Sequence, residues 1–374
     1  MEPKIMLIGL GSLGDTVLEL LVREESLGQI VVCSLVEKEA AARCNLARLS
    51  GLAQGRTPRL FFFPLDLNNR EAVIDIVERE SPDLILNTAS LQPWWLPDLL
   101  PQEPASLLKS AGFGVWLPFH LTLAMKLMEA LHEMRYPGVS LVASFPDVVN
   151  CILGRIHLAA TCGIGNLDEV VPKVRTLAAE RLQASVEEIR VILVAHHALQ
   201  PFAFGKPLEE IPPYFLRIEH RGKDVTEEVN GKELLFAPYE IPPGPAIHYL
   251  TAGSAVRLIK AFFSEKDSLL HAPSPRGLPG GYPVIVSQRG IRVAELKGLS
   301  LEEAIAINEH SHRFDGIEKI EPDGMVVFCD RDADVLKRAL GYDCRRLSPS
   351  ESEARAEELT ARFREYAKKF GVAI

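Results

Sequence analysis

Two adjacent histidines close an apolar run in the middle of the chain, and their imidazole rings suit proton transfer near neutral pH. The run covers residues 189–197 (IRVILVAHH) and ends in His196 and His197. An imidazole can accept a hydroxyl proton while a hydride leaves the neighbouring carbon, or return that proton in the reverse reaction. The alternative is one satisfied core histidine beside one surface histidine. The pair is therefore a candidate for general acid–base chemistry.

A glycine pattern near the start of the chain suits a dinucleotide. The segment Gly9-Leu10-Gly11-Ser12-Leu13-Gly14 follows an apolar strand pattern and opens a helix pattern. Glycines in this context permit a tight turn and let backbone N–H groups approach a pyrophosphate at the helix N-terminus. A purely structural glycine turn is the alternative. The pattern predicts that Gly9, Gly11, Ser12, Leu13 and Gly14 bind the cofactor.

Acidic residues after the next two strand patterns are candidates for the adenosine end of that cofactor. We expect Glu37 at the end of a strand over residues 29–37, where it would accept hydrogen bonds from the ribose and repel a 2′-phosphate. This favours NAD over NADP, although Lys38 and Arg43 lie close enough to neutralise a phosphate. Asp66 either flanks the adenine or caps a helix.

Polar residues at the end of the fourth strand pattern are expected near the nicotinamide. Asn87, Thr88 and Ala89 occupy that position, and ligands of open parallel sheets bind at the carboxyl ends of the strands. Trp94 and Trp95 follow in a proline-flanked loop. They either cover an apolar or sugar-like substrate and exclude water, or pack beneath the loop.

The elements that must position these residues alternate between strand and helix, which is typical of a parallel sheet with covering helices. The expected strands are residues 4–9, 29–37, 59–66, 83–90 and 139–146, and the expected helices are 15–25, 39–49, 69–80 and 121–134. Residues 91–119 are rich in Pro, Trp and Gly and are expected to form a long functional loop. Residues 1–150 are thus predicted to be an α/β Rossmann domain.

The second half mixes the two patterns without alternation, as an α+β domain does. Helices are expected over residues 168–182, 246–263, 300–312 and 350–369, and strands over 189–197, 214–226 and 282–296. Because a chain of 374 residues exceeds the usual size of a single core, residues 151–374 are predicted to form a second, substrate-binding domain.

Composition excludes several classes of partner. A formal net charge of −9 argues against nucleic acid or an anionic membrane as the main partner, since both require a basic face. The six cysteines include no C-x-x-C pair, which fits a reducing cytoplasm and predicts no metal site. The chain also starts without a signal sequence, and no apolar run reaches membrane-spanning length. We expect a cytoplasmic protein with a small-molecule substrate.

Several segments together resemble the lactate/malate dehydrogenase family. GLGSLG is similar to its cofactor loop, LVASFPDVVNCILGRI to its T-N-P-V-D segment, GIGNLDEVVPKVRTLAAERLQ to its G-x-N-L-D helix, and VAHHALQ to its G-E-H-G segment. The resemblance implies an NAD-dependent dehydrogenase or reductase that forms a homodimer or homotetramer. Counted from the shared E-R-L, it assigns catalysis to His197 and leaves His196 beside the substrate.

The same resemblance implies roles for two residues of the predicted helix after Asn166. Asp168 matches the aspartate that orients the catalytic imidazole. Where the family binds a 2-oxo acid with an arginine, this chain has Val171 or Lys173, so Lys173 is expected to bind an anionic group. Residues 82–134 contain no arginine at all. Plain lactate or malate is therefore not the expected substrate.

Three alternatives stay open. NAD- and metal-dependent family 4 glycosidases share this fold, and Cys162 with His197 would take the places of their metal ligands. PDLILNTAS resembles saccharopine and opine reductases, which implies reductive amination. A non-catalytic NAD sensor is the third alternative, and it predicts that His197 is buried with no open cleft beside it.

Overall fold

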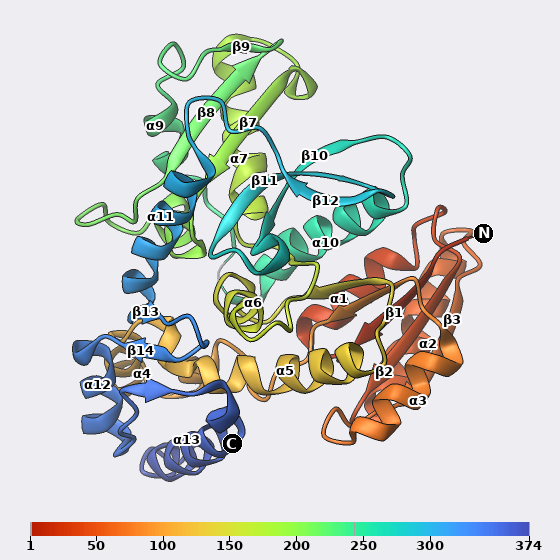
Figure 1. The fold of residues 1–374 in the computed structure, drawn as a ribbon, viewed down its shortest axis with the longest axis vertical. Coiled ribbons are helices and arrows are strands. Elements are labelled where there is room, and N and C mark those ends of the chain that lie inside the picture. The colour runs from red at the N-terminus through yellow and green to blue at the C-terminus, as the bar shows by residue number, and fades with distance from the viewer. Residues whose placement is uncertain (1, 243, 374) are drawn as a thin grey trace.

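The computed structural model describes residues 2–242 and 244–373, and their first half forms a parallel sheet (Figure 1). The six strands lie in the order β3-β2-β1-β4-β5-β6, and all of their pairings are parallel. Their bounds are β1 (Lys4–Ile8), β2 (Gln29–Ser34), β3 (Arg59–Pro64), β4 (Leu84–Asn87), β5 (Val139–Val142) and β6 (Cys162–Gly163). The strand order reverses between β1 and β4, which is where such sheets bind ligands.

Helices connect these strands, as the alternating pattern predicted. They are α1 (Ser12–Leu21), α2 (Glu37–Ala53), α3 (Arg70–Glu80), α5 (Leu117–Glu133) and α6 (Pro146–Arg155). Local chemistry sets their ends: the Asn69 side chain accepts the Ala72 N–H at the start of α3, and Ser81 ends that helix in the left-handed conformation. The expected loop over residues 91–119 instead contains α4 (Gln102–Lys109) and two 3₁₀ turns.

The second half builds three small antiparallel sheets, and the third of them, within residues 317–347, belongs to the last part of the chain. The first contains β7 (Ile189–Val194), β8 (Phe215–His220) and β9 (Lys223–Asp224), and it packs on α7 (Leu167–Leu182). Two short helices, α8 (Gln200–Ala203) and α9 (Gly231–Phe236), flank it. The second sheet contains β10 (Ser268–Pro273), β11 (Gly281–Ser287) and β12 (Gly290–Val293), with α10 (His248–Phe262) packed between it and α1.

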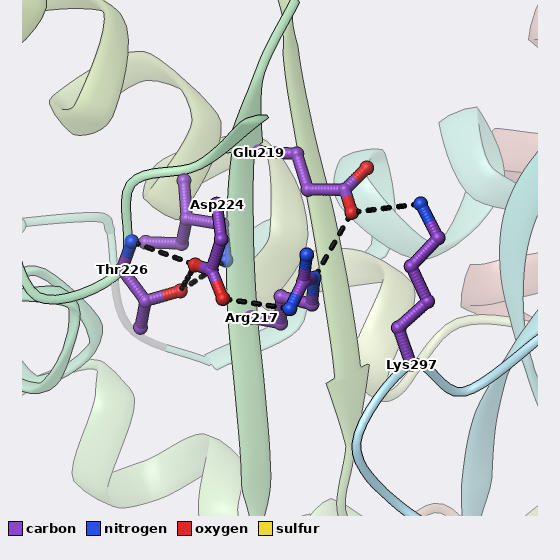
Figure 2. A network of polar contacts seen from close by, with 6 residues as sticks. Arg217, Glu219, Asp224, Thr226 and Lys297 are labelled. Atoms are coloured by element: carbon purple, nitrogen blue, oxygen red, sulfur yellow. Dashed lines mark hydrogen bonds and ion pairs between the residues drawn. The ribbon is translucent and has the colours of Figure 1, made fainter. Parts of the chain in front are cut away.

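A polar network ties the β8–β9 hairpin to the neighbouring sheet (Figure 2). Arg217 donates to Glu219 at 2.9 Å and to Asp224 at 2.7 Å. Thr226 donates to Asp224, and Lys297 reaches Glu219 at 3.3 Å. None of these residues lines the cleft described below, so the network is structural.

The last part of the chain returns to the first half. It contains α11 (Leu301–Ser311), β13 (Ile317–Ile320), β14 (Val326–Phe328), α12 (Asp330–Leu340), β15 (Arg346–Leu347) and α13 (Ser352–Lys368). In Figure 1, α12 and α13 lie beside α4 and α5, and side chains of α5 and α13 share one apolar core. The predicted boundary at residue 150 falls inside α6. Among the described helices, none has both the length and the apolar character needed to cross a bilayer.

Candidate functional site

A large cleft runs from the glycine loop to His197. Its volume is about 970 Å³, and its wall comes from the carboxyl ends of the parallel strands, from the segment after β4 and from the turn after β7. Gly9, Gly11, Ser12 and Leu13 line one end, and His197 lines the other. The cleft therefore joins the predicted cofactor loop to the predicted catalytic histidine.

Steric contacts explain why two of the loop positions require glycine. Gly9 has φ +88°, and a Cβ there would lie 2.6 Å from the Ala89 nitrogen. A Cβ on Gly14 would lie 2.2 Å from the Gly9 oxygen. A Cβ on Gly11 would meet no atom within 4 Å, so this glycine leaves free space beside the cleft wall. Such a cradle lets a ligand approach the backbone closely.

The end of β4 holds the loop from below. Thr88 donates its hydroxyl to the Gly9 oxygen at 2.6 Å, and both Thr88 and Ala89 line the cleft. Asn87 is 1% exposed and does not line the cleft, because its Oδ1 turns back to accept the Ala89 N–H at 3.0 Å. Asn87 thus supports the turn from beneath, where we had expected it to order the nicotinamide directly.

The end of the cleft that was predicted to receive adenosine differs from the expectation at one position. Strand β2 ends at Ser34, and Glu37 is an exposed residue that opens α2 outside the cleft lining. Glu39 and Arg43, one helical turn apart, line the cleft and form an ion pair at 2.8 Å. Asp66 also lines it and accepts the Asn68 N–H at 2.9 Å, whereas the cap of α3 is Asn69.

Two tryptophans stand over the glycine loop. Trp94 and Trp95 both line the cleft, with their rings in an edge contact at 5.5 Å. Trp94 Nε1 donates to His248 Nε2 at 3.3 Å, so Nδ1 of that ring carries the proton and donates to Ser12 Oγ at 3.0 Å. His248 thereby connects α10 to the start of α1 and to the tryptophan segment.

Four titratable side chains meet at the other end of the cleft. The Asp147 Oδ2, from the first turn of α6, accepts the backbone N–H of His197 at 2.6 Å. The Asp315 Oδ2 lies 3.2 Å from Nδ1 of both His196 and His197. Asp147 and His196 are fully buried, whereas the partly exposed His197 and the nearly buried Asp315 both line the cleft. His196, predicted beside the substrate, faces inward instead.

Burial drives all four groups toward their neutral forms. It lowers the pKa of His197 to about 3 and lowers the pKa of His196 as well. It raises the pKa of Asp147 to about 7, and burial together with the charge of Asp147 raises the pKa of Asp315 well above its usual range. The cluster therefore presents neutral imidazoles beside acids that resist ionisation.

Asp168 and Lys173 do not reach this cluster. Asp168 lies on α7 and pairs with Arg257 of α10 at 2.6 Å, and burial raises its pKa to about 6. Lys173 is 3% exposed, and its Nζ donates to the backbone oxygens of Ala203, Leu235 and Ala237. The Lys173 ammonium therefore has a structural role, because it links these backbone segments. Neither Asp168 nor Lys173 lines the cleft.

Sequence reasoning missed Glu169, the neighbour of Asp168. Glu169 lines the cleft, where it accepts hydrogen bonds from Thr251 at 2.6 Å and from Gln200. Burial raises its pKa to about 7. The capping pattern Asn166-x-x-Glu169 was a visible signal, and the structure contains that capping box. Asp147 lies in the LVASFPDVVNCILGRI segment, but nothing in that segment marked it as a partner of the histidines, and Asp315 lies in no recognisable motif.

Comparison with solved structures identifies the fold. The chain matches a lactate dehydrogenase from Eimeria maxima, solved with NADH and oxamate, with a TM-score of 0.54 and 15% identity over 83% of this chain and 93% of that one. It matches a malate dehydrogenase from Plasmodium falciparum with a TM-score of 0.55 and 13% identity, over 97% of this chain and 100% of that one. It matches a lactate dehydrogenase from Cryptosporidium parvum, solved with lactic acid and NAD, with a TM-score of 0.58 and 14% identity. This match covers 84% of this chain and 96% of that one.

The chain has the fold of the lactate and malate dehydrogenases. The resemblance noticed in the sequence is thus confirmed for the fold, including the Rossmann sheet and the α+β region after it. No protein-family model matches the sequence, and no curated protein matches it. At this low sequence identity, the similarity establishes the fold alone.

Proposed function

We propose that this protein binds a nicotinamide dinucleotide, NAD in preference to NADP, and transfers a hydride between it and a secondary alcohol or carbonyl compound. The observation that carries the proposal is the continuous cleft between the Gly9–Gly14 loop and His197. The fold agrees with it, because solved structures of the same fold contain NADH or NAD. When bound, the dinucleotide would supply the hydride chemistry.

The residues present fit a dinucleotide. Free space at Gly11 admits a phosphate to the N-terminus of α1, where backbone N–H groups and the helix dipole favour an anion. At the adenosine end, Glu39 takes the place that we had given to Glu37, and it would repel a 2′-phosphate. Arg43 lies beside it and would attract one. The preference for NAD therefore requires that repulsion of the 2′-phosphate by Glu39 outweigh its attraction by Arg43.

His197 would handle the proton of the reaction. Its neutral ring can accept the hydroxyl proton as the C–H hydride leaves, so that alcohol becomes carbonyl plus one proton. Asp315 lies at Nδ1, which leaves Nε2 for the substrate oxygen. Asp315 is thus the positioning residue in place of Asp168.

The substrate is neither lactate nor malate on this proposal. Among the described residues that line the cleft, Arg43 is the only arginine, and it lies at the adenosine end. Without an arginine near His197, the site has no bidentate clamp for a 2-oxo carboxylate. Phe113 and Phe145 flank the His197 ring at 6.1 and 5.1 Å, which favours a substrate with an apolar part.

The alternatives differ in how well they fit this site. Cys162 is fully buried on β6 and does not line the cleft, which argues against the cysteine–histidine pair of the glycosidase hypothesis. His197 lines an open cleft, contrary to what the sensor hypothesis predicts. Reductive amination stays a prediction, as do the homodimer or homotetramer, the cytoplasmic location and the division at residue 150.

Calorimetry with NADH and NADPH tests the cofactor, and a panel of alcohols, amines and glycosides with NAD tests the reaction by the absorbance of the reduced cofactor. We expect NADH to bind at least about tenfold more tightly than NADPH, which is about 1.4 kcal/mol, and turnover of an alcohol. Equal or tighter NADPH binding would show that Arg43 dominates. If neither cofactor binds, the proposal is wrong.

A further inference from the structure

The cluster of Asp147, His196, His197 and Asp315 has a geometry that acid–base catalysis alone does not require. A catalytic imidazole needs one carboxylate to orient it, whereas here two imidazoles and two carboxylates converge. Three separate parts of the chain supply them: α6, the turn after β7, and the 3₁₀ turn His312–Asp315. The arrangement therefore has a surplus of ligand atoms.

The distances match those between the ligands of one metal ion. Asp147, His196 and His197 each offer one ligand atom, and these atoms lie within 4.8 Å of one another. The distance from Asp315 Oδ2 to His197 Nδ1 is 3.2 Å, and that from His197 Nδ1 to Asp147 Oδ2 is 3.9 Å. His196 Nδ1 accepts the Ala198 N–H at 3.3 Å, which leaves its unpaired Nε2 as the ligand atom of that ring. Two ligands of a tetrahedral zinc ion, each about 2.1 Å from it, lie roughly 3.4 Å apart. The measured distances bracket that separation.

The cluster also contains buried polar atoms without partners. Within the described chain, Asp147 Oδ1, His196 Nε2, His197 Nδ1 and Asp315 Oδ2 make no hydrogen bond. A buried polar atom left unpaired costs about 1–3 kcal/mol, so four in one place need an explanation. Asp147 and His196 are fully buried, and Asp315 is 4% exposed. These unpaired atoms are shielded from water.

Charge points the same way. In residues 2–242 and 244–373, the ion pairs of Asp147 and Asp315 are with the two histidines, and no lysine or arginine pairs with either acid. Burial without a cationic partner opposes the ionisation of both carboxyl groups, and a bound cation would favour their ionised, metal-binding forms. Imidazole and carboxylate ligands together suit a divalent transition-metal ion.

We propose that Asp147, His196 and His197 bind one divalent transition-metal ion, of which Zn²⁺ is the best fit, with Asp315 as a fourth ligand or as the partner that orients the two rings. The site lies at the end of the cleft, because His197 lines it. A metal there would be within reach of an oxygen of the substrate. The sequence had predicted no metal, since these ligands do not follow one another in a metal-binding motif.

The chemical role of this ion rests on the proposed hydride transfer, but its binding does not. With the ion bound, His197 would be a ligand instead of the proton acceptor, and the ion would lower the pKa of the substrate hydroxyl, whose proton would pass to solvent water as the hydride leaves. Metal binding and cofactor binding can therefore be measured separately. Failure of one leaves the other standing.

Metal content and titration of the purified full-length protein test the site. After chelator treatment and dialysis, calorimetry with ZnCl₂ should give one site per chain, and CoCl₂ should give the visible absorption bands of four-coordinate Co²⁺. MgCl₂ should bind far more weakly, because Mg²⁺ prefers oxygen ligands and its own water. If neither Zn²⁺ nor Co²⁺ binds to the wild-type protein, the proposal is overturned.

Variants locate the ion. Asp147→Asn and His196→Gln should each weaken Zn²⁺ binding by about 100-fold or more, because even partners outside the ligand set change affinity by 10–100-fold. The matched control is Asp168→Asn, which alters a buried carboxyl paired with Arg257 outside the cluster and should bind Zn²⁺ as the wild type does. Unchanged affinity in both test variants, or loss of binding in Cys162→Ser, would contradict the assignment. NADH binding, followed in each variant, reports on the proposed function alone.

Discussion

At the scale of single residues, the glycines of the Gly9–Gly14 loop differ in their steric surroundings. Gly9 and Gly14 sit where a methyl group would strike the backbone or a fixed side chain, whereas Gly11 sits beside free space. The sequence pattern treats the three as equivalent. The structure separates two positions that require glycine on steric grounds from one that leaves free space beside the cleft, and substitutions can measure each.

We expect Gly11→Ala to weaken NADH binding by at least about tenfold, because its methyl group would occupy the space left for a phosphate, and one factor of ten corresponds to about 1.4 kcal/mol. Its melting temperature should match the wild type, since no atom lies within 4 Å of the added Cβ. Gly9→Ala is the contrasting variant. It should lose about 1–3 kcal/mol of unfolding free energy to the left-handed backbone alone. NADH fluorescence titration and thermal melts measure both effects, and equal melting temperatures would contradict the distinction.

His197 and Asp315 should act on one chemical step. His197→Asn should lower turnover of a verified substrate by roughly two to four orders of magnitude, the usual contribution of acid–base catalysis, without changing NADH affinity. Asp315→Asn should lower it less, and the double variant should fall little below His197→Asn, because both remove the same function. Rate constants for the four proteins decide the matter. Losses that simply multiply would separate the two residues, and full turnover by His197→Asn would remove it from the reaction.

At the scale of elements, the segment after β4 is joined to the Gly9–Gly14 loop through His248. His248 of α10 receives a hydrogen bond from Trp94 and gives one to Ser12 at the start of α1. A helix of the second half thus bonds to a loop of the first. The segment after β4 and the loop are linked through this helix by neutral hydrogen bonds, which form and break easily.

Trp94→Phe removes the hydrogen bond to His248 and keeps an aromatic ring. A neutral hydrogen bond contributes about 1 kcal/mol, so we expect the substrate KM to rise about fivefold and amide hydrogen exchange in residues 91–99 to become faster. Trp95→Phe is the matched control, because Trp95 contacts the His248 ring at 5.6 Å without bonding to it through the indole nitrogen. Equal effects of the two substitutions would refute a specific role for the Trp94–His248 bond.

Elements with a local signal were predictable, and contacts between distant elements were not. The strand, glycine loop and α1 follow from periodicity and turn chemistry within about 20 residues of chain. Glu37 fails because α2 begins three residues after β2 ends, so the cleft receives Glu39. Asp168 and Glu169 differ by one helix position, and only the packing of α7 decides which of them faces the cleft. Asp147 and Asp315 reach His197 through tertiary folding, which no spacing in the sequence encodes.

At the scale of the whole molecule, buried histidines link folding to pH. His271 on β10 accepts the Leu193 N–H at 3.2 Å, and burial, with the charges of Arg257 and Arg175, lowers its pKa to about 3. An unfolded chain binds a proton at this residue near pH 6.5, whereas the folded chain resists it. The stability that His271 contributes is therefore fully present above pH 6.5 and declines as the pH falls toward 3.

Urea unfolding across that range tests the effect. His271→Gln keeps an acceptor for Leu193 but does not titrate, so its unfolding free energy should fall less steeply than that of the wild type between pH 6.5 and pH 4. Asp168 faces the same region, has a raised pKa of about 6 and changes stability in the opposite sense. Because both the wild type and His271→Gln contain Asp168, its effect cancels when the unfolding free energy of one protein is subtracted from that of the other at each pH. If the unfolding free energies of the wild type and His271→Gln change in parallel with pH, His271 is not the source of the pH dependence.

The shared core of α5 and α13 has a consequence for biosynthesis. Asp315 belongs to the last sixth of the chain, which packs on the helices of the first half. Domains fold as they leave the ribosome, N-terminal first. The glycine loop can therefore form early, while the acid beside His197 arrives only after about 300 further residues have been made. A nascent or truncated polypeptide that stops before residue 312 would still carry the loop for a dinucleotide but would lack Asp315 at the catalytic end.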